Sequence, residues 1–171
     1  MERPSVDDYF GDWKQREALA QEMIPVIGRL FSQRNVGIYI YGRPLHNRSV
    51  TFIMKSHRFV RQVERNEMSE FETHPMLLAL AKLDLWHAQI DLGKLTVRFM
   101  GQQGVNRVDR LSEDDFVRNE LAYLDGVKES PIEKTQDIVL YGFGRIGRLM
   151  ARLLVERTST GEVIRLKAIV V

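Results

Sequence analysis

The sequence predicts an α/β protein in which a mainly helical region is followed by a β-α-β unit. Apolar residues recur at spacings of three and four through much of residues 1–128, a periodicity typical of helices that bury one face. From residue 137 a short β-branched run leads into a glycine-rich turn, a second helical pattern and another β-rich run. This order of elements indicates two parallel strands joined by a helix.

The first helix is expected to begin beside Ser5, whose side chain can accept hydrogen bonds from the first free amides. Asp7 and Asp8 suit the positive end of the helix dipole. Apolar positions from Leu19 to Phe31 continue the same buried face. Pro25 has no amide hydrogen, so it should kink this helix or split it in two.

Two segments of the helical region have strand character. Residues 36–41 form a short aromatic and β-branched run that is closed by Gly42, and they predict a strand. Residues 90–99 are ambiguous, because their apolar positions fit either an alternating strand or a buried helix.

Three further helix starts are expected from capping residues. Ser49 can cap one helix. Thr73 is expected to open another, with Pro75 near its first turn, where a missing amide hydrogen costs little. Ser112 is followed by Asp115 in a capping-box arrangement, with aspartate in place of the usual glutamate.

The predicted domain boundary follows from the expected end of the helix that begins at Ser112. Asp125-Gly126 is a stop signal, and the stretch after it is polar and contains Pro131. We therefore expect a mainly helical domain over 1–128, a linker over 129–136, and an incomplete β-α-β unit over 137–171.

The glycines after the run 137–141 match the G-x-G-x-x-G fingerprint of dinucleotide-binding Rossmann domains in its required context. Gly142 allows the sharp turn, Gly144 lets a pyrophosphate approach the backbone, and Gly147 lets the helix pack closely. The amides of Arg145 and Ile146 would point at the pyrophosphate. The expected cofactor-binding residues are Gly142, Phe143, Gly144, Arg145, Ile146 and Gly147.

The fingerprint also expects an acidic residue at the end of the second strand to hold the ribose hydroxyls. Glu162 lies at the start of that strand, which is the wrong end. The expected cofactor is therefore NAD or NADP, without a preference between them.

Residues 142–148, Gly-Phe-Gly-Arg-Ile-Gly-Arg, closely resemble the amino-terminal signature of glyceraldehyde-3-phosphate dehydrogenase. Shorter stretches, 41–45, 90–95 and 139–144, resemble the longer bacterial form of that family, which has an amino-terminal extension. Tyr141 stands where most members have asparagine, and Val171 stands where the ribose-binding aspartate would be.

This resemblance implies the NAD(P)-dependent oxidative phosphorylation of glyceraldehyde 3-phosphate, and we expect the full-length protein to be a homo-oligomer. The family uses a cysteine thiolate and a histidine that lie well downstream of the glycine turn. The 171 residues contain no cysteine, so no catalytic residue is expected among them. They are expected to be the extension and the first β-α-β unit of such an enzyme.

The composition also indicates a globular protein that is neither secreted nor embedded in a membrane. The chain is 44% hydrophobic and 28% charged, as in ordinary globular proteins. The lack of cysteine fits a reducing cytoplasm, and the acidic amino terminus is not a secretory signal. No apolar run reaches the length of about 18 residues that spans a membrane. A net charge of +2 is too small to indicate nucleic-acid binding by itself, and none is expected, although a pI near 9.0 leaves that possibility open.

Other polar residues carry weaker signals. The four histidines, at 46, 57, 74 and 87, have no ligand spacing, so no metal site is expected. Arg43, His46 and Arg48 crowd one loop, which is either an anion patch or, in the favoured interpretation, a solvated loop. A second group recurs at helical spacing and fits a solvated basic stripe better than a nucleic-acid or acidic-partner surface: Lys55, Arg58, Arg61 and Arg65.

Two alternatives to the dehydrogenase hypothesis remain open. The helical region can be a regulatory or protein-interaction module, joined to a non-catalytic partial Rossmann segment. The chain can also belong to another Rossmann enzyme that shares the glycine turn by convergence.

Overall fold

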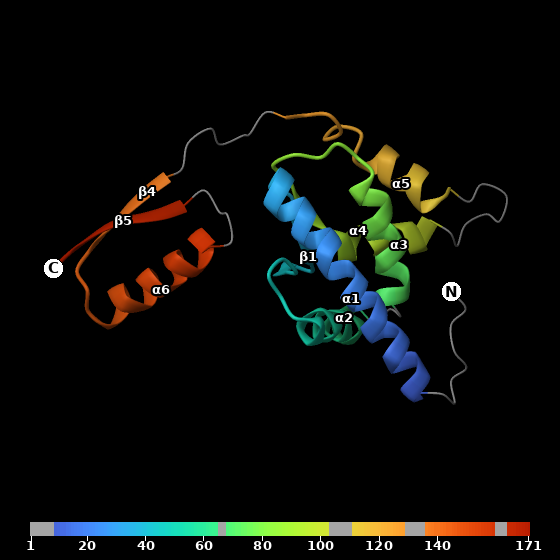
Figure 1. The fold of residues 1–171 in the computed structure, drawn as a ribbon, viewed down its shortest axis with the longest axis horizontal. Helices are drawn as coiled ribbons and strands as arrows, with labels where there is room; N and C mark the ends of the chain where they lie inside the picture. Colours follow the sequence, from blue (N-terminus) through green and yellow to red (C-terminus); the bar gives the residue numbers. More distant parts are fainter. Residues whose placement is uncertain (1–8, 65–67, 103–110, 129–135, 160–163) are drawn as a thin grey trace. The chain divides into compact units, whose positions relative to one another are not determined.

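The computed structural model describes residues 9–64, 68–102, 111–128, 136–159 and 164–171. The chain is a mixed α/β protein that divides into two compact units, unit 1 from Met1 to Lys128 and unit 2 from Glu129 to Val171 (Figure 1). No helix in the described ranges is long and apolar enough to cross a membrane. The expected cap at Ser5 and most of the expected linker lie outside the described residues.

Unit 1 begins with the long helix α1 (Tyr9–Arg34). Pro25 lies inside this helix without splitting it. The carbonyl that loses its partner is that of Gln21, and both residues are exposed, so water can satisfy it. The buried face of α1 includes Met23, Ile27 and Leu30.

A small three-stranded sheet follows. β1 (Gly37–Ile40) confirms the strand predicted over 36–41, and it pairs antiparallel with β2 (Arg43–Pro44) and parallel with β3 (Gln89–Asp91). Tyr41 and Gly42 join β1 to β2 with positive φ angles of 48° and 76°, as in a type I′ hairpin turn. The ambiguous segment 90–99 is therefore divided, with β3 running directly into α4 (Leu92–Gln102).

Asp91 holds this arrangement together. One of its carboxylate oxygens accepts the amide hydrogens of Tyr41 and Lys94, each at 3.0 Å, and the other accepts that of Gly42 at 3.1 Å. A single side chain thus binds the hairpin turn and the first turn of α4 at the end of β3.

The remaining helices complete the core. α2 (Val50–Glu64) is capped by Ser49 as expected, since the Phe52 amide donates to its hydroxyl at 3.3 Å. α5 (Glu113–Glu120) is capped by Ser112, whose hydroxyl accepts from the Asp115 amide at 3.1 Å. It ends earlier than expected, and a turn leads to Gly126 at φ 77°.

The expected start of α3 (Glu70–Ala81) at Thr73 is wrong. Ser69 is the N-cap, and it forms a full capping box with Glu72, whose carboxylate accepts from the Ser69 amide at 2.7 Å. Thr73 lies one turn inside, with its hydroxyl on the Ser69 carbonyl at 3.1 Å. Pro75 is therefore an interior residue of the helix.

α3 contacts α1, α4 and α5, and α2 contacts α1 (Figure 1). These contacts enclose one hydrophobic core, whose largest fully buried side chains include Phe116, Met23, Ile38, Met76 and Leu85. Burial of side chains this size contributes about 1.5–3 kcal/mol each.

One polar cluster is buried beside this core. His57 is fully buried; its Nδ1 donates to the Ile53 carbonyl at 2.9 Å, and its Nε2 lies 2.8 Å from the Thr73 hydroxyl. Glu70, which is 2% exposed, has Oε1 3.2 Å from His57 Nδ1 and Oε2 3.9 Å from Arg16 Nη1. Burial lowers the pKa of His57 to about 4 and raises the pKa of Glu70 to about 7.

Replacing Asp91 should weaken unit 1 through the turn it holds. Asp91→Ala removes three hydrogen bonds to a carboxylate, so we expect the free energy of unfolding to fall by about 2 kcal/mol in urea denaturation. Asp91→Asn keeps one acceptor oxygen and should lose less. Equal stability of Asp91→Ala and wild type would contradict the role of this carboxylate.

His57 and Glu70 should change the free energy of unfolding in opposite directions as pH changes. His57 has a folded pKa of about 4, below its ordinary 6.5, so the unfolded chain binds the extra proton and stability falls as pH drops through this window. Glu70 has a folded pKa of about 7, above its ordinary 4.5, so the folded chain holds the proton and stability falls as pH rises through that window. Between 4.5 and 6.5 the two contributions oppose each other.

Replacing one residue of this pair should reveal how the other makes the free energy of unfolding depend on pH. Relative to wild type, the unfolding free energy of Glu70→Gln should rise with pH, and that of His57→Gln should fall, by up to about 1.4 kcal/mol per pH unit. Urea titrations from pH 4.5 to 6.5 measure this difference. Parallel pH profiles for all three proteins would refute the assignment.

Candidate functional site

The described residues of unit 2 form a β-α-β unit. β4 (Gln136–Tyr141) and β5 (Ile164–Val170) are parallel neighbours, and α6 (Arg145–Ser159) packs against them (Figure 1). β4 starts at Gln136, one residue earlier than expected. Because the strands are parallel, their carboxyl ends meet at one edge, and the glycine turn lies at that edge.

Ion pairs link β4 to β5 near the amino ends of the two strands. The Asp137 carboxylate accepts two hydrogen bonds from Arg165, at 2.8 and 3.1 Å, and lies 3.3 Å from Lys167 Nζ. The hydrogen bonds from Arg165 are the main cause that lowers the pKa of Asp137. Lys167 falls at a register shift, where Ile138 pairs with Leu166 but Val139 pairs with Ala168. Arg165 and Lys167, two residues apart in β5, both reach the Asp137 carboxylate.

Gly142 begins the turn with a φ of 97°, a conformation that residues with a β-carbon adopt only with strain. Its amide donates to the Val170 carbonyl at 2.7 Å, which ties the turn to the end of β5. A β-carbon placed on Gly147 would lie 2.3 Å from the Gly142 carbonyl oxygen. The first turn of α6 therefore touches the backbone of the turn, and only glycine fits at this contact.

The N-terminus of α6 supplies the donors of the site. The Arg148 amide bonds to the Gly144 carbonyl at 3.0 Å, which is the first bond of the helix. The amides of Arg145, Ile146 and Gly147 precede it, so helix geometry gives them no partner within the helix. A β-carbon on Gly144 would have no atom within 4 Å, and Gly144, Arg145 and Ile146 are exposed. An anion can approach here as at other helix N-termini.

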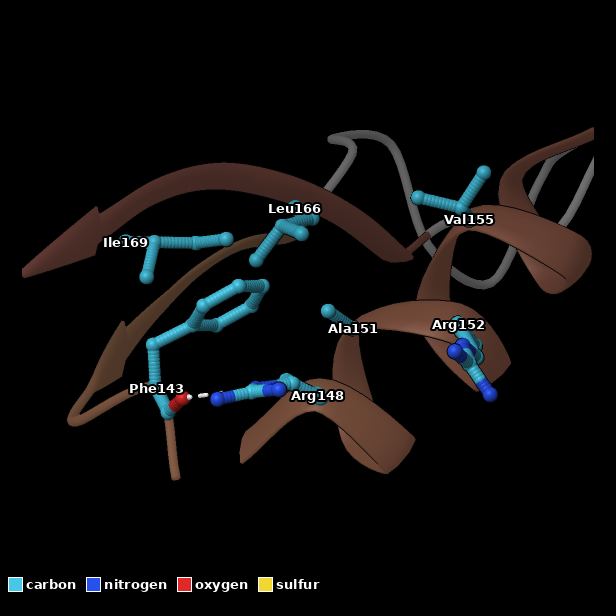
Figure 2. Close-up of a pocket in the computed structure, with 7 residues that line it drawn as sticks. All are labelled: Phe143, Arg148, Ala151, Arg152, Val155, Leu166 and Ile169. Carbon is cyan, nitrogen blue, oxygen red and sulfur yellow. Dashed lines mark hydrogen bonds between the residues drawn. The ribbon is translucent and has the colours of Figure 1, made fainter. Parts of the chain in front are cut away.

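The side chain of Phe143 points away from these amides. Figure 2 shows its ring directed into a hollow between α6 and β5, near Leu166, Ile169 and Ala151. The Phe143 carbonyl accepts a hydrogen bond from Arg148 Nε at 3.3 Å. The hollow has a volume of about 620 Å³ and a mainly apolar lining that also includes Arg152 and Val155. Sequence reasoning missed Arg148, because its role depends on a contact with a backbone carbonyl.

The carboxyl end of β5 carries no acidic side chain, since β5 ends at Val170 and is followed by the exposed Val171. Glu162 lies outside the described residues. Among the described residues, this end of β5 therefore offers no acidic group of the kind that would distinguish NAD from NADP.

The four histidines lie in separate surroundings. His46 stacks on Phe31 with ring centroids 4.1 Å apart, and His57 belongs to the buried cluster of unit 1. His74 Nε2 lies 3.1 Å from Glu22 Oε2, and His87 Nδ1 lies 3.3 Å from Asn35 Nδ2. Within the described ranges no three metal-binding side chains gather.

No family model matches the chain. It is 48% identical over 151 residues to a glyceraldehyde-3-phosphate dehydrogenase-like protein of Pseudomonas aeruginosa strain UCBPP-PA14. The chain is a relative of this dehydrogenase-like protein. The alignment covers 87% of the chain, so it must include residues of both units. It covers 32% of the relative, so the chain spans about a third of that protein's length.

The contact between Gly147 and Gly142 should be the most sensitive point of unit 2. In Gly147→Ala the new β-carbon meets a backbone oxygen, and we expect a loss of about 1–3 kcal/mol of stability. Gly144→Ala meets no atom and should change stability by less than about 0.5 kcal/mol. Amide hydrogen exchange of β4 and β5 measures the stability of both variants. Equal protection in Gly147→Ala and Gly144→Ala would contradict the close approach of Gly147 to the Gly142 carbonyl.

Proposed function

We propose that this chain is the amino-terminal part of an NAD(P)-dependent glyceraldehyde-3-phosphate dehydrogenase, and that residues 142–147 bind the pyrophosphate of the cofactor. The observation that carries the proposal is the close contact of Gly147 with the Gly142 carbonyl beside the open space at Gly144. The similarity to the Pseudomonas dehydrogenase-like protein supports it independently.

Each residue of the turn has a role in this proposal. Gly142 reverses the chain direction at φ 97°, and Gly147 brings α6 against the turn. Gly144 leaves room for phosphate oxygens, and the amides of Arg145 and Ile146 donate to them with support from the helix dipole. Phe143 contributes packing beneath the turn, because its ring lines the hollow between α6 and β5.

The nicotinamide cofactor supplies hydride transfer when bound, and these residues bind and orient it. The reaction of the family also needs a thiolate that adds to the aldehyde carbon. The 171 residues contain no cysteine, so the proposal assigns this step to a part of the protein beyond them. The full-length enzyme would be a homo-oligomer in the cytoplasm, and residues 1–128 would be its extension domain.

A regulatory or protein-interaction role for the helical region is the second candidate. It is favoured by one observation: unit 1 has its own core, and the buried residues of that cluster all lie before Lys128. Residues 1–128 would then bind a partner after 129–171 are deleted. A passive extension would bind none, and its loss would leave the activity of the longer enzyme intact.

Cofactor binding should depend on Gly144. In the whole gene product, Gly144→Ala places a methyl group where the pyrophosphate would lie, so we expect NAD and NADP to bind about tenfold more weakly, or about 1.4 kcal/mol, by calorimetry. Gly28→Ala is the matched control, because its β-carbon also meets nothing within 4 Å but lies in unit 1. Unchanged affinity in Gly144→Ala would reject the pyrophosphate site.

The coding sequence after Val171 tests the enzyme class separately. For a dehydrogenase, we expect this coding sequence to contain a cysteine in a Ser-Cys-Thr-Thr-Asn-Cys-like segment and a histidine further on. A stop codon at that point would reject the dehydrogenase and favour the helical module.

A further inference from the structure

The charges of this chain are unevenly distributed along its sequence. Between Glu22 and Glu64 there is no aspartate or glutamate over 41 residues, yet this segment holds 7 of the 25 lysines and arginines. The rest of the chain has 18 basic and all 23 acidic side chains. The net charge of +2 is therefore a sum over one strongly basic segment and an acidic remainder. The seven basic residues are Arg29, Arg34, Arg43, Arg48, Lys55, Arg58 and Arg61.

The fold gathers part of this segment on one helix. The Arg43 guanidinium lies 3.8 Å from the ring centroid of Phe59, and that of Arg48 lies 5.0 Å from the ring of Phe52. Both rings belong to α2, seven residues apart, which is about 10 Å along the helix. Lys55 lies between them in sequence. The two loop arginines thus lie against the helix that carries Lys55 and Arg58.

Four side chains make up this surface, which we name the α2 basic face: Arg43, Arg48, Lys55 and Arg58. Arg48, Lys55 and Arg58 are exposed, and in the described part of the chain none of the four is paired with a carboxylate. His46 is not part of the face, because it is buried against Phe31. Arg61 is also left out, since it is half-buried near Arg16 and Glu70.

The chemistry of this face fits an anion with repeated charges. A guanidinium stacked on a ring is held in place, and its N–H groups match two oxygens of one phosphate. Thr51 and Gln62 are exposed on the same helix and can donate to phosphate oxygens as well. Phe52 and Phe59 are half-buried under the two arginines, so these rings offer little free apolar surface to a protein partner.

We propose that the α2 basic face binds the phosphate backbone of nucleic acid, without reading its sequence. The four cations of this face would neutralise several successive phosphates and release their counterions. This function is independent of the glycine turn, which belongs to the other unit. It also departs from the expectation based on net charge, because a net charge does not reveal how charges are distributed.

Fluorescence anisotropy tests the proposal with the full chain and a labelled oligodeoxythymidine of about 16 nucleotides. We expect binding at low salt, with log Kd rising against log salt at a slope of about 3, as for four phosphates on a single strand. The variant Lys55→Gln with Arg58→Gln removes two contacts, so the slope should fall by about 1.4 and the affinity by tenfold or more.

The matched control is Lys94→Gln with Arg118→Gln, which removes the same net charge from exposed positions of α4 and α5 in the same unit. Its affinity should equal that of wild type, and circular dichroism melting confirms that both double variants fold. Equal weakening by the two double variants would overturn the proposal, as would no binding at low salt. Binding to polyglutamate or anionic vesicles as tight as to the oligonucleotide would also overturn it.

Discussion

The first turn of α6 lies against the backbone that ends β4, with no room for a β-carbon at Gly147. This contact sets the direction of the helix relative to the strand, and therefore the direction of the amides at its N-terminus. The bond from the Gly142 amide to the Val170 carbonyl fixes the end of β5 to the same turn. The candidate site is consequently built from backbone groups, whose positions depend on three glycines rather than on side-chain chemistry.

The sequence predicted features whose causes are local. The glycine turn needs certain residues at fixed spacing, and Ser49 and Ser112 cap helices within a few residues of themselves. The start at Thr73 was wrong because Ser69 and Glu72 form a stronger local signal, a capping box, just before it. The parallel pairing of β1 with β3 joins residues about fifty apart, and no local pattern specifies it. Asp91 contributes to that pairing through amides that its own sequence neighbourhood does not reveal.

Ring stacking changes how the basic residues of unit 1 should be interpreted. In sequence, the loop holding Arg43 and Arg48 and the helix holding Lys55 and Arg58 are separate groups, and each fits a solvated surface. Phe52 and Phe59 join them, because each ring takes one loop arginine onto the helix. The half-buried aromatic residues thus position charge as well as contributing to packing.

The core of unit 1 has a consequence for synthesis of the chain. Phe116 and Val117 of α5 are almost fully buried, so the core cannot close before that helix has left the ribosome. Unit 1 contributes every buried residue of this cluster, so it can then fold while unit 2 is still being translated. Ile146, Leu149 and Leu153 of α6, which remain exposed, would emerge after a folded unit is already present. Vectorial synthesis therefore separates in time the segments whose apolar surfaces would otherwise compete during folding.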